Sequence, residues 1–314
     1  MAENKAEARE ADGGPRRRRV DAAEAARARA RAVSLPDTPS DYPRELEKIE
    51  VELLLDGIHR HYGFDFRSYA YSSIKRRLWK RIQQEGLETV SALQDRVLHD
   101  PALMEELLLD LSINVTAMFR DPGFYLAFRT QVVPVLRTYP FIRVWHAGCS
   151  TGEEVYSMAI LLQEEGLYDR ARIYATDINE VVLHRAKSGI FPLEKMQEYT
   201  QNYLAAGGAR SFSEYYTAMY DGALFNASLT RNVVFSQHNL VTDGSFAEFN
   251  VILCRNVMIY FDRDLQNRVH ELFAASLVPF GLLCLGNKES LRFTAFEERY
   301  EALNAKEKIF RRKG

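Results

Sequence analysis

The sequence predicts an α/β protein in which a parallel sheet covered by helices follows a small all-helical domain. Apolar residues recur at helical spacing from Tyr42 to about Ser112, whereas short β-type runs alternate with helical segments in the later part of the chain. Such alternation is typical of parallel strands joined by crossover helices. We therefore expect a helical domain at 39–112, a linker at 113–124 and a sheet domain at 125–314.

The composition is typical of a globular protein that does not insert into a membrane. Of the 314 residues, 46% are hydrophobic and 27% are charged. The longest apolar segment, Leu277 to Leu285, contains a proline and a glycine and is shorter than the roughly 20 residues that a membrane helix needs. Cys149, Cys254 and Cys284 are widely spaced without a CxxC pair. This spacing argues against a disulfide framework or a zinc site and favours a reducing, cytoplasmic compartment.

Residues 1–38 are expected to form a disordered basic tail. The first 31 residues carry nine Lys or Arg against six Asp or Glu, with almost no large apolar side chain. Such a segment cannot bury enough surface to offset the entropy cost of ordering it. The apolar stretch that follows the basic residues of a signal peptide is missing. An electrostatic arm is the functional alternative to a passive tail.

Within the sheet domain, the order of the expected elements is strand, helix, strand. Strands are expected at 142–146, 172–176, 250–254 and 282–285, and helices at 153–165, around 181–186 and around 265–273. Residues 211–236 do not fit this order, because short β-type runs, Val233–Phe235 among them, surround the hairpin signal Asp221-Gly222. We expect a small antiparallel β insertion at about 208–237.

Ligands of open parallel sheets bind at the carboxyl ends of the strands, so the loops there are candidate sites. The loop from Gly148 to Glu154 has small residues that let a ligand approach the backbone, and its carboxylates suit a cation better than a pyrophosphate. Thr151 and Glu154 also match a capping box, which would give Glu154 a structural role. Asp177 follows the second strand, where an acid can hold a ribose diol. Its alternative role is to cap the helix that begins at Asn179.

Five segments resemble, in order and with appropriate spacing, the CheR-type chemotaxis receptor methyltransferases. They are NVTAMFR at 114–120, GCSTGEEVYS at 148–157, ATDINE at 175–180, HNL at 238–240 and CRNVMIYFD at 254–262. The resemblance runs from about Tyr42 to the end of the chain. It implies a Rossmann-like methyltransferase domain that uses S-adenosylmethionine (SAM). It also implies methyl transfer to glutamate side chains of bacterial chemoreceptors, with S-adenosylhomocysteine as the product.

The resemblance assigns a role to each matching residue. Arg120 and Tyr260 would lie closest to the reacting centre as catalytic residues. Glu154 would lie near the cationic methionine end of SAM, and Asp177 would bind the ribose. The implied cofactor-binding residues are, in full, Asn114, Thr116, Arg120, Glu154, Asp177, Asn239, Leu240, Arg255 and Asn256.

The chemistry of a carboxylate acceptor fits the roles of Arg120 and Tyr260. A glutamate side chain has an ordinary pKa of about 4.3, so it is already an ionised nucleophile at neutral pH and needs no general base. The remaining requirement is to hold the carboxylate in line with the methyl group, and such positioning can lower the reaction barrier by roughly 7 to 11 kcal/mol. A guanidinium can orient a carboxylate through two hydrogen bonds, and a phenol can donate one.

Residues 75–81 place five positive charges in seven residues. We expect these charges to spread over the exposed face of a helix whose Ile74, Leu78 and Ile82 face the core. A solvated surface and nonspecific nucleic-acid binding are alternatives. The resemblance implies contact with the acidic cytoplasmic helices of chemoreceptors instead, and no nucleic-acid partner. The expected substrate-binding residues are Lys75, Arg76, Arg77 and Arg81, and the protein is expected to act as a monomer.

Several positions depart from the usual family pattern, which bears on cofactor geometry more than on activity. They are Val155 after the two glutamates, Asn250 before the fourth strand, and Asn287-Lys288 before Glu289. A noncatalytic SAM-binding scaffold of the same fold is the main alternative function. A nucleic-acid methyltransferase would carry an Asn/Asp-Pro-Pro-Tyr loop where this chain has RNVMIY. A thiol enzyme built on Cys254 would need a nearby activating histidine, which that loop lacks.

Overall fold

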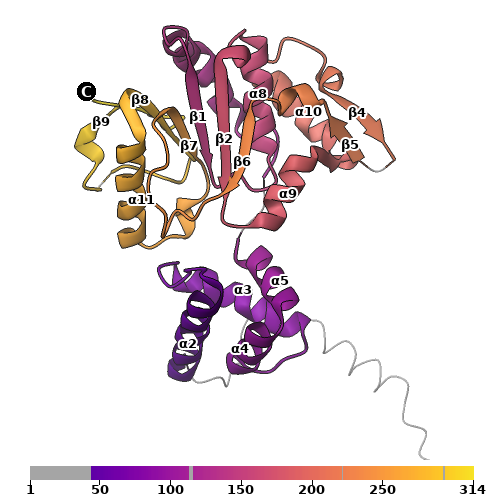
Figure 1. Ribbon diagram of the computed structural model, residues 1–314, viewed down its shortest axis with the longest axis vertical. Coiled ribbons are helices and arrows are strands. Elements are labelled where there is room, and N and C mark those ends of the chain that lie inside the picture. The colour runs from indigo at the N-terminus through magenta and orange to yellow at the C-terminus, as the bar shows by residue number, and fades with distance from the viewer. Residues whose placement is uncertain (1–43, 113–115, 221, 293) are drawn as a thin grey trace, which may run out of the picture. The chain divides into compact units, whose positions relative to one another are not determined.

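A computed structural model describes residues 44–112, 116–220, 222–292 and 294–314. Two sequence predictions, the basic tail at 1–38 and the role of Asn114, lie outside the described residues. None of the helices in the described ranges is long and apolar enough to span a bilayer. Helices and strands carry the labels of Figure 1.

Four helices form the first part of the described chain (Figure 1). They are α2 (Arg44–Tyr62), α3 (Tyr71–Gln84), α4 (Val90–His99) and α5 (Pro101–Leu111). Two of them begin at side-chain caps. The Thr89 hydroxyl accepts a hydrogen bond from the Ala92 amide, and the Asp100 carboxylate accepts hydrogen bonds at the start of α5. The expected all-helical region before the sheet is therefore confirmed.

A seven-stranded sheet with the order β6-β2-β1-β7-β8-β10-β9 follows. Its strands are β1 (Ile142–Ala147), β2 (Ala171–Asp177), β6 (Val233–Gln237), β7 (Phe249–Cys254), β8 (Leu277–Leu285), β9 (Tyr300–Asn304) and β10 (Ile309–Arg312). The first five strands in this order pair in parallel, whereas β10 is antiparallel to both β8 and β9. The predicted parallel α/β sheet is confirmed, and the hairpin of β9 and β10 is an addition that was not predicted.

Helices cover both faces of this sheet. They are α6 (Pro122–Ala127), α7 (Val133–Leu136), α8 (Glu153–Glu164), α9 (Glu180–Ser188), α10 (Met196–Ala205) and α11 (Arg263–Ser276), with a π-helical turn at Phe128–Val132. Alternate residues of β7 enter two separate cores. Val251 and Leu253 pack in the core that contains α8, and Ile252 and Cys254 pack in the core that contains α11. Burial on both faces explains why β7 is apolar from Val251 to Cys254.

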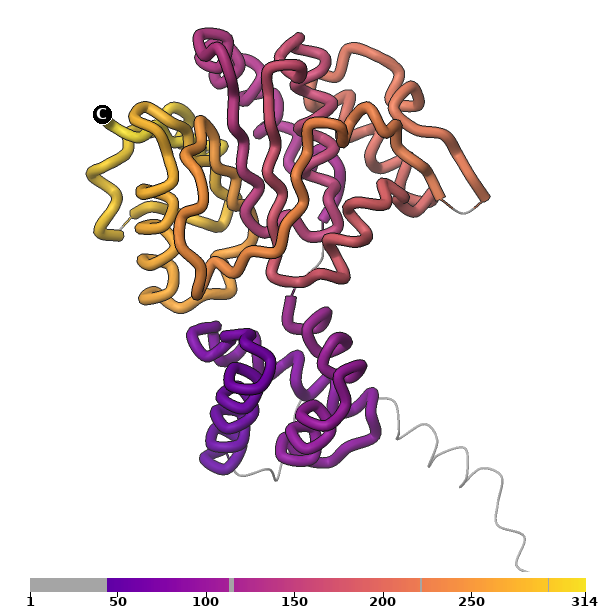
Figure 2. The backbone as a smooth tube through the Cα atoms, viewed as in Figure 1, coloured from indigo at the N-terminus to yellow at the C-terminus, as the bar shows by residue number. Residues whose placement is uncertain are grey.

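A three-stranded antiparallel sheet lies to one side of the larger sheet (Figure 2). Its strands, in the order β3-β5-β4, are β3 (Ile190–Pro192), β4 (Tyr216–Met219) and β5 (Gly222–Phe225). The predicted hairpin corresponds to β4 and β5, and β3 was not predicted. The assignment of Val233–Phe235 to this insertion is wrong, because these residues belong to β6 and pair in parallel with β2. A short β-type run does not specify its partner strand.

The loop between α2 and α3 supports the segment that follows β7. Two backbone hydrogen bonds of 2.8 and 2.9 Å join residues 68–70 to residues 260–262. Between them, Tyr69 and Phe261 form an antiparallel bridge, and their ring centres lie 4.9 Å apart. The helical region therefore helps to position Tyr260.

Buried His270 predicts that the protein loses stability below neutral pH. Its imidazole is 1% exposed, and its Nδ1 has no hydrogen-bond partner among the described residues. Burial lowers the pKa of His270 to about 4, so between pH 6.5 and 4 the unfolded chain binds a proton that the folded chain does not. We expect this group to remove about 2 kcal/mol of unfolding free energy between pH 7.5 and 5, measured by urea unfolding.

The variant His270→Leu should have a flatter dependence of the unfolding free energy on pH in this range. His184→Asn, which removes an exposed imidazole on α9, is the matched control and should keep the wild-type dependence. If His270→Leu kept the wild-type slope, burial of this imidazole would not be the cause.

Candidate active site

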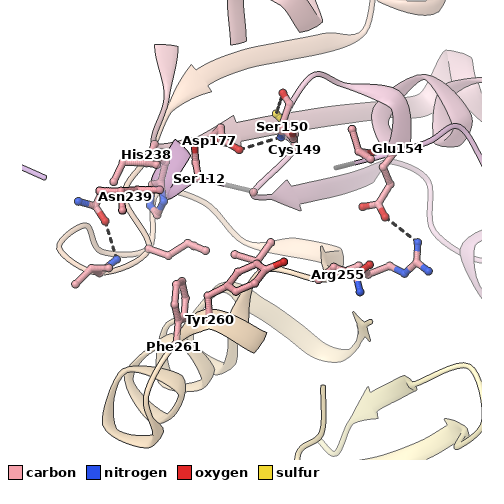
Figure 3. A pocket seen from close by; sticks show the side chains of 18 of the residues that line it. Ser112, Cys149, Ser150, Glu154, Asp177, His238, Asn239, Arg255, Tyr260 and Phe261 are labelled. Atoms are coloured by element: carbon pink, nitrogen blue, oxygen red, sulfur yellow. Dashed lines mark hydrogen bonds and ion pairs between the residues drawn. The ribbon is translucent and has the colours of Figure 1, made fainter. Parts of the chain in front are cut away.

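A cleft with about 980 Å³ of space opens at the carboxyl ends of β1, β2, β6 and β7 (Figure 3). Open parallel sheets bind their ligands at this edge. The cleft brings together every described residue that was predicted to bind the cofactor or to act in catalysis. These lining residues are Thr116, Arg120, Glu154, Asp177, Asn239, Leu240, Arg255, Asn256 and Tyr260.

The loop after β1 packs so closely that it requires glycine. Gly148 has a φ of 82°, and a Cβ there would lie 2.6 Å from Cγ2 of Val257. The amides of Gly148 and Cys149 both donate to the Thr176 carbonyl at 2.9 Å. A side chain at position 148 would therefore push apart two walls of the cleft.

Glu154 lines the cleft and does not act as a helix cap. Helix α8 begins after Gly152, whose φ is 96°, and no side chain caps it. The Glu154 carboxylate bonds to His146 Nδ1 at 3.0 Å. It also accepts a hydrogen bond from Arg255 at 2.9 Å, which Figure 3 shows. Burial alone would raise the pKa of Glu154, but His146 and Arg255 outweigh it and lower the pKa to about 2. Glu154 is therefore ionised at neutral pH.

The Arg255 guanidinium joins segments that are far apart in the sequence. Its side chain is 2% exposed and donates to Glu154, to Asp121 at 2.9 Å, and to the Arg120 carbonyl at 3.4 to 3.5 Å. The guanidinium carbon also lies 4.1 Å from the centre of the Phe124 ring. Such partners are needed because an unpaired buried charge is strongly destabilising. Arg255 therefore holds the linker against the end of β7.

Asp177 ends β2 and lines the cleft. Its Oδ2 accepts a hydrogen bond from the Ser150 amide at 2.9 Å, and its Oδ1 accepts one from the Asn179 amide at 3.1 Å. The side chain that caps α9 is that of Asn179, so the alternative role of Asp177 as the cap is wrong. Burial raises the pKa of Asp177, and the backbone amides oppose this rise. The two oxygens still have acceptor capacity for the hydroxyls of a ligand.

Glu289 fixes the segment that follows β7. Its carboxylate, 5% exposed, accepts hydrogen bonds of 2.6 to 3.0 Å from the amides of Gly286, Asn256, Val257 and Met258. Asn256 has a φ of 63°, a conformation that costs energy for a residue with a side chain. The four hydrogen bonds stabilise this turn and so form one wall of the cleft. The contribution of Glu289 was not predicted from the sequence.

Tyr260 lines the cleft from a 3₁₀ turn at Met258–Tyr260. The Arg77 guanidinium lies over its ring, with 4.9 Å between the guanidinium carbon and the ring centre. Arg77 is 6% exposed and donates to the Leu111 carbonyl at 2.6 Å. Its Nη2 has no hydrogen-bond partner in the described part of the chain. Arg77 therefore supports Tyr260 from the helical region.

The expectation that the basic residues of α3 spread over an exposed face is wrong for most of them. Three of the five cations form ion pairs with acidic residues of neighbouring helices, and Arg77 is buried. Arg76 is exposed and forms no ion pair with a described carboxylate. The ion pairs are Lys75 with Glu47 (2.7 Å), Lys80 with Asp110 (3.0 Å), and Arg81 with Asp110 (2.5 Å), Glu85 (3.3 Å) and Glu106.

Some lining residues were not predicted. The lining residues from the helical region could not be identified from a local sequence pattern, because only the fold brings them to the cleft. His238 could have been found beside Asn239, since it is polar and follows a strand. It is 7% exposed, and its Nδ1 has no hydrogen-bond partner among the residues described. The missed residues include Tyr69, Leu111, Ser112, Ile178, His238, Val241 and Phe261.

Comparisons with known proteins agree with this fold. The family model described as CheR methyltransferase, SAM binding domain, matches residues 114–309, and the CheR methyltransferase all-alpha domain matches residues 49–112. A relative from Pseudomonas putida with the name "Putative methyltransferase Cher3" is 54% identical over 264 residues, which are 84% of this chain and 97% of the relative.

Two further relatives are named as chemotaxis enzymes. Chemotaxis protein methyltransferase 2 of Pseudomonas aeruginosa is 31% identical over 79% of this chain and 88% of its own length. The chemotaxis protein methyltransferase of Salmonella typhimurium is 30% identical over 74% of this chain and 81% of its own length. The cofactor is therefore S-adenosylmethionine, and this chain belongs to the CheR family of chemotaxis methyltransferases.

Proposed function

We propose that this protein transfers the methyl group of SAM to glutamate side chains in the cytoplasmic helices of chemoreceptors. The products are glutamate methyl esters and S-adenosylhomocysteine, and the protein acts in the cytoplasm as a monomer. The observation that carries the proposal is that Arg120, Asp177 and Tyr260, from three separate segments, line one cleft. Relatives named as chemotaxis protein methyltransferases support the choice of pathway.

The side chains of the cleft fit the cofactor. The Asp177 carboxylate has acceptor capacity for the ribose hydroxyls, and Gly148 allows close approach to the backbone. The ionised Glu154 suits the cationic methionine end, and we assign Asn239 and Leu240, which line the same cleft, to the border of the adenine. When bound, SAM supplies a methyl group activated by a sulfonium.

Three other predicted cofactor residues differ in how directly they can contact SAM. Thr116 and Asn256 line the cleft and can hydrogen-bond a ligand there. Arg255 is already bonded to Glu154 and Asp121, so we assign it a positioning role for Glu154 and the linker.

The acceptor needs orientation and no proton transfer, because its carboxylate is ionised at neutral pH. The Tyr260 hydroxyl can donate one hydrogen bond to a carboxylate oxygen, and the Arg120 guanidinium can donate two. Arg77 lies behind the Tyr260 ring and holds it in place. In the proposed transfer a carboxylate oxygen would supply the electron pair of the new ester bond. The bond between the methyl carbon and sulfur would break with its electron pair left on the sulfur of S-adenosylhomocysteine, and no bond to hydrogen would change.

The first experiment separates catalysis from the alternative of a noncatalytic scaffold. The full-length protein is incubated with methyl-labelled SAM and chemoreceptor cytoplasmic fragments from the same genome. We expect alkali-labile label on receptor glutamates, because methyl esters hydrolyse in base. Tight SAM binding without transfer to any of these receptors would support the scaffold.

The Tyr260 hydroxyl is expected to matter for turnover and not for folding. Tyr260→Phe removes one hydrogen bond to a charged acceptor, so kcat should fall about 10- to 100-fold while the SAM dissociation constant stays within about twofold. Tyr139→Phe, on a half-buried ring before β1, is the control and should keep full activity. Wild-type kcat in Tyr260→Phe would remove Tyr260 from the reacting centre.

Asp177→Asn is expected to weaken SAM binding. An amide offers one acceptor oxygen where the carboxylate offers two, so the SAM dissociation constant should rise about tenfold in isothermal titration calorimetry. Thermal unfolding of the same samples shows whether the backbone bonds from Ser150 and Asn179 survive. An unchanged affinity in a folded variant would contradict ribose binding by Asp177.

A further inference from the structure

A second hollow, with about 720 Å³ of space, lies next to the segment that carries Tyr260. Met258 and Ile259 line this hollow, whereas their chain neighbours Val257 and Tyr260 line the first cleft. Its other walls come from the first half of α11 and from the chain after β8. These walls begin where the parallel strands β7 and β8 end, which is the same edge of the sheet as the cleft.

Three basic residues line the second hollow. Arg263, Lys288 and Arg292 are exposed and form no ion pair with a carboxylate in the described part of the chain. The hydroxyl-bearing Ser290 lies among them. Glu289 is the one carboxylate among the described lining residues, and its oxygens accept four backbone hydrogen bonds. The hollow therefore presents positive charge that the described chain does not neutralise.

The unpaired cations of the second hollow contrast with the basic residues of α3, most of which are paired or buried. Lys75, Lys80 and Arg81 are paired with carboxylates of the same helical region and Arg77 is buried, so Arg76 is the one exposed cation of α3 that forms no ion pair with a described carboxylate. Like charges around one hollow repel each other, and an anion that binds there relieves the repulsion. Arg263 also lies only three residues after Tyr260. The charge suited to an acidic partner is thus found next to the proposed reacting centre.

We propose that Arg263, Lys288 and Arg292 bind an acidic side chain of the acceptor protein, close to the glutamate that receives the methyl group. This proposal rests on the proposed function. Residues three or four positions apart lie about 5 to 6 Å apart on one face of a helix. A helical acceptor can therefore direct one carboxylate to Tyr260 and a neighbouring one to the second hollow.

The proposed subsite has a consequence for the choice of acceptor. Glutamates with an acidic neighbour on the same helix face would be preferred over glutamates with a neutral or basic neighbour. Because the three cations are exposed, the preference should weaken as salt increases.

The test compares two triple variants of the full-length protein. One neutralises the subsite, and the other removes the same charges elsewhere. The control residues are Arg143, Arg172 and Lys187. All three are exposed and form no ion pair with a described carboxylate, and Arg143 and Arg172 lie at the amino ends of β1 and β2. The subsite variant is Arg263→Gln, Lys288→Gln, Arg292→Gln, and the control is Arg143→Gln, Arg172→Gln, Lys187→Gln.

The subsite variant should raise the KM for the acceptor fragment about tenfold, because three exposed ion pairs are lost. Its kcat and its SAM dissociation constant should stay within about twofold of wild type, and its KM should depend less on sodium chloride. The control variant should match wild type in all four measurements. Binding of the fragment in the presence of S-adenosylhomocysteine gives a second readout that does not require turnover.

These measurements distinguish failure of the subsite from failure of the proposed function. Weaker fragment binding by the subsite variant alone supports the subsite even where the wild type shows no methyl transfer. An unchanged KM and binding constant, or equal losses in both triple variants, would overturn it. Binding of inorganic phosphate that needs the three cations, with acceptor KM unaffected, would assign the hollow to a small anion instead. A wild type that binds no acceptor fragment would overturn both proposals.

Discussion

The buried Arg255 guanidinium is the interaction on which the cleft depends. It bonds at once to Glu154 at the start of α8, to Asp121 in the linker and to the Arg120 carbonyl. Desolvating this charge is costly, so the arrangement is stable only when all partners are in place. Packing over Phe124 adds to the constraint. The linker therefore has one path along the end of β7, and that path determines where the Arg120 side chain begins.

The elements that the sequence predicted well are those with a local cause. β1, β2 and β7 are short strands that are buried except near the amino ends of β1 and β2, and polar residues lie at or just after the carboxyl end of each. Asp177 and Tyr260 could be assigned to one cleft because parallel strands end at a common edge. The sequence motifs then indicated the chemical roles of these residues, which strand periodicity alone does not indicate.

The sequence predictions that were wrong concern residues whose contact partners are distant in the sequence. Val233–Phe235 has the composition of any short strand, and only pairing with β2 places it in the larger sheet. The charges of α3 suggested an exposed face because the sequence of one helix does not reveal that Glu47 and Asp110 lie opposite them. Glu154 matched a local capping pattern, yet one of its two side-chain partners, Arg255, is 101 residues away. Ion pairs of this kind follow from the fold.

The bridge between Tyr69 and Phe261 has a consequence for the evolution of such enzymes. Because the helical region supplies backbone bonds to residues 260–262 and walls to the cleft, the two parts do not form independent modules. A chimaera that joins the helical region of one homologue to the sheet of another would place foreign residues against Tyr260. Exchange at the linker would therefore also replace one side of the contact between positions 69 and 261.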